Sequence, residues 1–190
     1  MKRLRVLVAC EFSGIVRDAF IKRGHDAVSC DLLPTEQPGP HIQGDVLKQL
    51  KYCWDMMIAH PPCTRLCNSG VRWLRERDLW EEMIDSAAFF RTLLTKGPCE
   101  RRVIENPIMH RYAKKIIGQE PEQIIQPWQF GHGETKATCL WLRNLKKLKP
   151  TNIVEGRDHR IWKMPKTPDR GKLRSLTFQG IADAMAEQWG

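Results

Sequence analysis

Residues 4–31 read LRVLVACEFSGIVRDAFIKRGHDAVSCD and contain two strand-like segments with a helical one between them. The apolar run 4–9 predicts a buried strand, and residues 27–30 predict a second strand that ends at Asp31. Between them, residues 14–23 carry apolar side chains at helical spacing and predict a helix. A strand, a helix and a second strand in this order are typical of a parallel sheet.

The same alternation continues along the rest of the chain. Further strands are predicted at 56–59, 102–104 and 137–142. Helices are predicted at 78–95, 109–117 and 180–189. The stretch 32–40, rich in proline and polar residues, predicts a loop. We therefore expect an α/β fold with a mostly parallel sheet and helices on both faces, and a ligand site beyond the carboxyl ends of the strands.

Composition favours one domain in a reducing compartment. The chain has 190 residues, of which 42% are hydrophobic and 28% charged. No apolar run reaches the roughly 18 residues of a membrane span, and the N-terminus leads directly into the first strand, so we expect no membrane anchor or signal peptide. The seven cysteines include no Cys-x-x-Cys pair, which favours a reduced, cytoplasmic protein. No second ligand pair complements Cys63 and Cys67, so we expect no metal site.

Basic residues are concentrated in the segment 146–174. It holds ten basic and three acidic residues, which is +7 of the formal net charge of +9. Its prolines and glycines predict a loop-rich surface segment. A basic, irregular surface of this kind suits contacts with a phosphate backbone. A solvated face that only keeps the protein soluble explains the composition equally well.

The sequence His60-Pro61-Pro62-Cys63 follows the predicted strand at 56–59. The two prolines restrict the backbone and hold Cys63 in a stiff turn at the strand end. A thiolate is a strong nucleophile, and positive charge from His60 or Arg65 would favour it by lowering the thiol pKa. The alternative is a buried, inert cysteine.

The sequence Glu105-Asn106-Pro107 follows the predicted strand at 102–104. A carboxyl group at a buried strand end tends to have a raised pKa, which would let Glu105 hold a proton and donate it to a ring nitrogen. The alternative is that Glu105 caps a helix that begins near Ile108.

Five elements of the chain occur in the order and spacing of the DNA cytosine carbon-5 methyltransferases, and the chain resembles that family. They are Phe12-Ser13-Gly14, Asp31, Gly44-Asp45, Pro61-Pro62-Cys63 with Gly70 beyond it, and Glu105-Asn106. The resemblance covers nearly the whole chain and is strongest to small phage-type or prophage-type members. It implies a single domain, 1–190, with the Rossmann-like fold of S-adenosylmethionine-dependent methyltransferases.

The resemblance implies methyl transfer from S-adenosylmethionine to carbon 5 of cytosine in DNA. Cys63 would add to carbon 6 of the base, and Glu105 would stabilise the charge that develops at nitrogen 3. Residues 134–138 stand where the family has Gln-x-Arg-x-Arg, and Lys136 would replace one arginine as a point charge without its bidentate contacts. The implied cofactor contacts are Phe12, Gly14, Asp31 with the ribose, Asp45 with the adenine, Pro61 and Gly180.

The basic segment 146–174 stands where the family has a larger target-recognition region, which implies short or relaxed sequence specificity. The implied DNA contacts are Arg65, Arg72, Arg75, Lys147, Arg157, Arg160 and Lys163. Arg72, Trp73 and Arg75 are candidates to hold the gap that a rotated base leaves in the duplex. An accessory specificity subunit or a homodimer would also compensate for a small recognition region. The same chemistry on a free pyrimidine nucleotide or on single-stranded nucleic acid, and binding without turnover, remain alternatives.

Overall fold

A central sheet organises the computed structural model, which describes residues 2–96 and 99–190. Within those ranges seven strands lie in the order β3-β2-β1-β4-β5-β7-β6. The strands are β1 (Arg5–Ala9), β2 (Asp26–Asp31), β3 (His41–Gln43), β4 (Met56–Ala59), β5 (Arg101–Pro107), β6 (Gln123–Ile125) and β7 (Thr138–Arg143). Neighbouring strands from β3 to β5 pair in parallel, whereas β7 is antiparallel to both β5 and β6.

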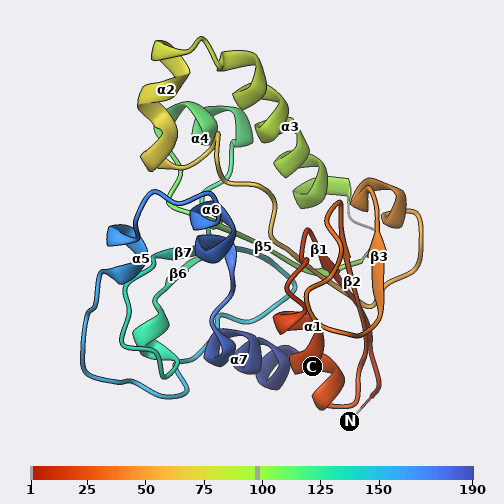
Figure 1. Cartoon of the computed structure of the whole chain (residues 1–190). Coiled ribbons are helices and arrows are strands. Elements are labelled where there is room, and N and C mark those ends of the chain that lie inside the picture. Colours follow the sequence, from red (N-terminus) through yellow and green to blue (C-terminus); the bar gives the residue numbers. More distant parts are fainter. Residues whose placement is uncertain (1, 97–98) are drawn as a thin grey trace.

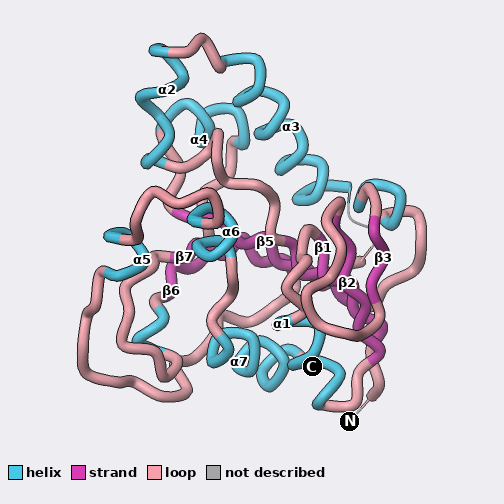
Figure 2. Tube along the Cα trace, viewed as in Figure 1, coloured by secondary structure: helices cyan, strands magenta, loops and turns pink. Residues whose placement is uncertain are grey.

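Helices cover both faces of this sheet (Figures 1 and 2). One face carries α1 (Ile15–Lys22) and α7 (Gln179–Trp189), and the opposite face carries α3 (Trp80–Lys96) and α4 (Arg111–Ile117). The shorter helices α2 (Val71–Glu76), α5 (Arg160–Lys163) and α6 (Arg170–Ser175) lie outside these two layers. None of the helices in the described ranges is both long and apolar enough to cross a membrane.

The two layers explain the continuous apolar run in β1. Val6 and Val8 pack in the core that contains α1 and α7, while Leu7 and Ala9 pack in the core that contains α3 and α4. All four side chains are fully buried. A strand that is buried on both faces has no polar alternation, which is why the run reads as uniformly apolar.

The sequence located most elements within two residues of their observed bounds, with one correction at β5. This strand was predicted at 102–104 but continues through Pro107, because its residues from Arg102 onward pair with β7. The motif Glu105-Asn106-Pro107 therefore lies in the strand itself. The suggestion that Glu105 caps a helix is also wrong: α4 begins at Arg111, and its capping side chain is His110, which accepts a hydrogen bond from the Ala113 backbone N–H.

The basic segment 146–174 is irregular apart from α5 and the start of α6. These two short helices were not predicted, and neither were the three-residue strands β3 and β6. In Figure 1 the segment passes along the same end of the sheet as α2, so two parts of the chain that are distant in sequence approach each other there.

Candidate active site

A pocket of about 320 Å³ lies beyond the carboxyl ends of β1, β2, β4 and β5. This is the edge at which ligands bind in parallel α/β sheets. The structure brings six of the predicted catalytic and cofactor residues to it: Phe12, Asp31, Pro61, Cys63, Glu105 and Lys136. Cys63 and Glu105 therefore face one shared space, as a single flat substrate ring would require.

Asn106 fixes the turn that carries Cys63. The residue is 1% exposed, and its side-chain amide donates a 2.8 Å hydrogen bond to the Pro61 carbonyl. After the turn, the Cys63 carbonyl accepts hydrogen bonds from the backbone N–H groups of Leu66 and Cys67. Because Asn106 lies on β5 and the turn follows β4, the Glu-Asn pair and the Pro-Pro-Cys turn are held together as neighbours in the sheet.

Cys63 holds its proton more tightly than a free thiol. A hydrogen bond with Cys67 and burial raise the pKa of Cys63, and Lys136 opposes them. The same hydrogen bond, with further donors from Ser69 and Gly70, lowers the pKa of Cys67 to about 5. One hydrogen bond thus shifts the pKa values of the two cysteines in opposite directions.

His60 and Arg65, expected to lower the pKa of Cys63, are not among the main causes of its shift, and each has a carboxylate partner of its own. The Nε of Arg65 donates to Glu82 at 2.8 Å, and the Nδ1 of His60 lies 3.2 Å from Glu105.

Glu105 is held as a carboxylate, which reverses the pKa direction expected from sequence. Burial raises the pKa of Glu105, but the hydrogen bond and charge of His60, together with the charge of Lys136, outweigh it and lower the pKa overall. The two side chains of the pair are largely buried, with 16% of Glu105 and 10% of His60 exposed. The Nε2 of His60 is buried without a hydrogen-bond partner.

Lys136 joins this pair from the loop before β7. Its Nζ donates a 2.9 Å hydrogen bond to the Leu176 carbonyl, just after α6. Burial lowers the pKa of Lys136, while the nearby Glu105 and Cys63 act in the opposite direction. Overall the pKa of Lys136 is lowered, so a thiol, a carboxylate and a lysine amino group line one pocket.

Asp31 and Glu11 shape the side of the pocket formed by β1 and β2. The Oδ1 of Asp31 accepts a hydrogen bond from the Leu33 backbone N–H, and the residue lines the pocket at the end of β2. Glu11 was not anticipated. It is 5% exposed, and its carboxylate accepts hydrogen bonds from the N–H groups of Val16 and Arg17, which caps α1. The sequence signal for this capping role was the position of Glu11, an acidic residue between a predicted strand and a predicted helix.

Three predicted cofactor residues do not line this pocket. Asp45 is exposed and its carboxylate caps the short helix that follows it, accepting from the Leu47 N–H. Gly14 takes a left-handed conformation at the start of α1, close to the Arg17 side chain. Gly180 donates its N–H to His132 and packs α7 against the Phe130 carbonyl.

Comparisons with known proteins find similarity to solved structures but none in sequence. No family model matches the sequence, and no curated protein matches it. The structure is similar to a protein described as a DNA modification methyltransferase encoded within an E. coli prophage, with a TM-score of 0.52 and 13% identity over 80% of this chain and 52% of that one. It is also similar to the Entamoeba histolytica methyltransferase EhMeth, with a TM-score of 0.52 and 14% identity over 81% of this chain and 58% of that one.

The chain has the Rossmann-like fold of S-adenosylmethionine-dependent methyltransferases. It spans between half and three fifths of the length of these two structures. The fold class expected from the alternation of strands and helices is thereby confirmed.

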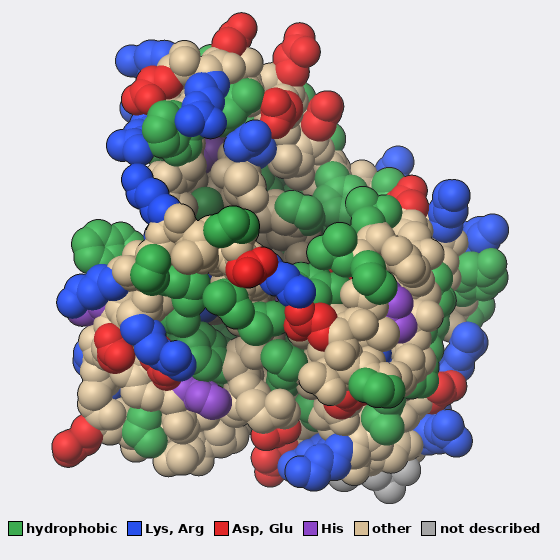
Figure 3. Space-filling view, in the orientation of Figure 1, with side chains coloured by type: hydrophobic (Ala, Val, Ile, Leu, Met, Phe, Trp, Pro, Cys, Tyr) green, Lys and Arg blue, Asp and Glu red, His purple; other side chains and the backbone are tan. Residues whose placement is uncertain are grey.

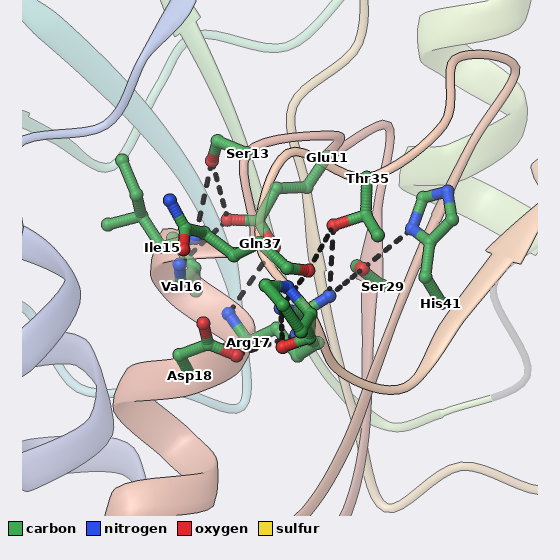
Figure 4. A network of polar contacts seen from close by, with 11 residues as sticks. Glu11, Ser13, Ile15, Val16, Arg17, Asp18, Ser29, Thr35, Gln37 and His41 are labelled. Carbon is green, nitrogen blue, oxygen red and sulfur yellow. Dashed lines mark hydrogen bonds and ion pairs between the residues drawn. The ribbon is translucent and has the colours of Figure 1, made fainter.

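Arg17 anchors the loop 32–40, which follows Asp31 in this methyltransferase fold (Figure 4). The side chain is fully buried, and its guanidinium donates hydrogen bonds to Asp18, Ser29, Thr35, Gln37 and Pro38. One buried cation thus connects α1, β2 and the loop, and fixes the chain on both sides of the pocket edge. The described ranges contain no group of three or more His, Cys, Asp or Glu side chains arranged to hold a metal ion.

The predicted DNA-contact residues fall into two groups. Arg65 and Arg160 are paired with the carboxylates of Glu82 and Glu134, and Arg157 lies over the Trp128 ring, so part of their charge is already satisfied within the protein. Of the others, Arg72 and Arg75 line grooves beside α2, and Lys163 is exposed in α5. Lys147 lies away from the pocket, because β7 ends where β5 begins and the carbonyl of the preceding Lys146 accepts a hydrogen bond from Trp189 at the end of α7. Figure 3 shows Lys and Arg side chains gathered along the outer edge of α2 and beside α5.

Proposed function

We propose that the protein transfers a methyl group from S-adenosylmethionine to carbon 5 of cytosine in DNA through a covalent bond to Cys63. The observation that supports this most directly is the convergence of Cys63, Glu105 and Lys136 on one pocket at the carboxyl ends of the strands. Nucleophile, acid–base group and cation are the groups this reaction needs, and grouped titratable side chains with shifted pKa values are typical of active sites.

Covalent addition makes carbon 5 reactive. That carbon is a poor nucleophile, so the Cys63 sulfur first bonds to carbon 6 after its proton passes to Cys67, its hydrogen-bond partner, and an electron pair of the ring moves toward nitrogen 3. Lys136 and Glu105 lie beside Cys63 and meet the charge that develops there. Glu105 is ionised at rest, so it must take up a proton before it can donate one, and His60 is its hydrogen-bonded neighbour.

The residues on the β1–β2 side of the pocket fit the cofactor. Phe12 and Pro61 offer apolar surface, and the carboxylate of Asp31 can accept a hydrogen bond from a ribose hydroxyl. When bound there, S-adenosylmethionine supplies an activated methyl group that carbon 5 can attack. Loss of the carbon-5 proton then restores the ring and breaks the bond to the Cys63 sulfur.

Transfer of tritium from labelled S-adenosylmethionine to DNA tests this proposal. We expect incorporation by the wild type and by Cys53→Ser, because Cys53 is an exposed cysteine that does not line the pocket, and none by Cys63→Ser. Single-stranded and duplex DNA are offered in parallel, with deoxycytidine monophosphate as competitor. Equal incorporation by Cys63→Ser and the wild type would refute the covalent mechanism. If deoxycytidine monophosphate inhibits the reaction at a concentration similar to that of the DNA, a free nucleotide is favoured as the substrate.

A further inference from the structure

A second groove, of about 450 Å³, lies between α2 and the α5–α6 segment. Among the described residues that line it are five cations, two indole rings and a serine, with no carboxylate. The cations are Arg72, Arg77, Lys166, Arg170 and Arg174. So many like charges in one groove repel each other unless a polyanion binds there, which is the electrostatic pattern of a nucleic-acid site.

Three of the arginines in the groove have aromatic or backbone partners within the protein. The guanidinium groups of Arg72 and Arg77 lie 4.1 Å and 4.3 Å from the centre of the Trp73 ring. Arg170 donates a 2.8 Å hydrogen bond to the Met164 carbonyl and a longer one to the Trp162 carbonyl. The cations on both sides are therefore held in place by aromatic and backbone contacts.

Trp162 gives the groove a free aromatic surface. Its side chain is 71% exposed, although an indole is large and apolar and is usually covered. Flat rings of this kind bind nucleic acid by stacking on a base, whatever the base is. A base can stack on protein only where it has left its neighbours in the duplex, so an exposed indole beside cations favours a single strand.

Arg174 connects this groove to the active-site pocket. It lines both, and its Nε is buried without a hydrogen-bond partner. The positive charge of Arg174 repels that of Lys136 and so contributes to lowering the pKa of Lys136. A strand in the groove can therefore bring one phosphate to Arg174 while the next base enters the pocket.

We propose that the groove binds a single strand of DNA, with Trp162 stacked on an unpaired base next to the target and Arg174 bound to the phosphate between them. This deepens the proposed function, on which it rests for the identity of the base in the pocket. The groove proposal specifies single-stranded or locally opened DNA as the substrate. A preference for duplex DNA would contradict it.

Equilibrium binding to the full chain tests the groove without any turnover. The probe is a fluorescein-labelled twelve-nucleotide strand, measured by anisotropy without cofactor and compared with the blunt duplex of the same sequence. We expect the wild type to bind the single strand about tenfold more tightly than the duplex, and Trp162→Ala to lose about tenfold in single-strand affinity, the effect of one stacked base. Trp162→Phe should recover most of the loss, because it retains a ring.

Ile153→Ala is the matched control, since Ile153 is 66% exposed in the same basic segment but does not line the groove. It should bind as the wild type does. Arg174→Gln should reduce the slope of log affinity against log salt by about 0.7, as expected for one lost phosphate contact on a single strand. Unchanged melting temperatures establish that all variants are folded.

Equal single-strand affinities of Trp162→Ala and Ile153→Ala would overturn the proposal, as would duplex binding as tight as single-strand binding. The two proposals fail separately. Absence of methyl transfer with an intact Trp162 effect would refute the enzymatic function and leave a strand-binding groove, whereas active enzyme with no Trp162 effect would refute the groove alone.

Discussion

Substitution of Gly180 by alanine tests whether this residue packs α7 or contacts a cofactor. The two roles predict opposite changes in the free energy of unfolding. The resemblance to cytosine methyltransferases implied a cofactor contact, but the structure places Gly180 in the first turn of α7 and outside the active-site pocket. A Cβ there would lie far inside the van der Waals contact distance of the Phe130 carbonyl oxygen, and 3.2 Å from the His132 Nε2. The obstacle on the Phe130 side is backbone, which cannot rotate away, so α7 itself would have to move.

The size of the effect follows from two opposing terms. Overpacking against a fixed backbone costs about 3 kcal/mol, and alanine regains about 1 kcal/mol over glycine in a helix, which leaves a net loss of about 2 kcal/mol. For a chain of this length that loss lowers the melting temperature by about 4–8 °C. If Gly180 served only a cofactor contact, Gly180→Ala would instead stabilise the cofactor-free protein by about 1 kcal/mol.

Urea unfolding of the cofactor-free protein, followed by far-UV circular dichroism, measures the sign directly. The matched control is Gly171→Ala, because Gly171 lies in α6 and a Cβ there meets no atom within 4 Å. We expect Gly171→Ala to unfold at the wild-type midpoint or above it, and Gly180→Ala clearly below it. A Gly180→Ala midpoint equal to or higher than the wild type would refute the packing argument.

Two further substitutions test buried charges. The pKa of Glu105 in the folded protein lies below its ordinary value of 4.5, so its ionisation stabilises the fold above that pH, and the contribution is lost as the pH falls through the lower, folded value. Urea unfolding should therefore show the wild type losing more stability than Glu105→Gln between about pH 7 and about pH 3, and an equal loss would contradict the direction of the shift. Arg17→Met should destabilise the protein by about 3 kcal/mol and speed proteolysis within 32–40, whereas Lys22→Met, an exposed cation on the same helix, should do neither.

The sequence pattern located the strands that are buried on both faces and the helices whose apolar residues recur at regular spacing. The strand β4 was predicted at its observed bounds, because its four residues are all buried and form an uninterrupted apolar run. The edge strands β3 and β6 have only three residues each and no regular alternation of buried and exposed side chains, so no local pattern marks them. The length of β5 is set by pairing with β7, more than thirty residues away, which no local pattern contains.

The site was predictable where its residues follow strands and unpredictable where they meet across the fold. Cys63 and Glu105 follow or end apolar runs, and their motifs were visible in the sequence. The pairing of His60 with Glu105 spans 45 residues and reverses the pKa direction that burial alone predicts. Arg174 carried no signal of its own, since one arginine in a basic segment resembles any other, and only the fold brings it to both the pocket and the groove.

The end of the basic segment and the residues that follow it form a wall of the pocket. Residues 171 and 174–177 line the pocket opposite the strand ends, and Lys136 is bound to the backbone carbonyl of Leu176. A change in the position of α6 therefore moves the cation beside Glu105 as well as the arginine that faces the groove. Under the two proposals, a strand in the groove and the groups that act on the base meet in seven consecutive residues, 171–177, so we expect the occupant of the groove to influence the chemistry of the pocket.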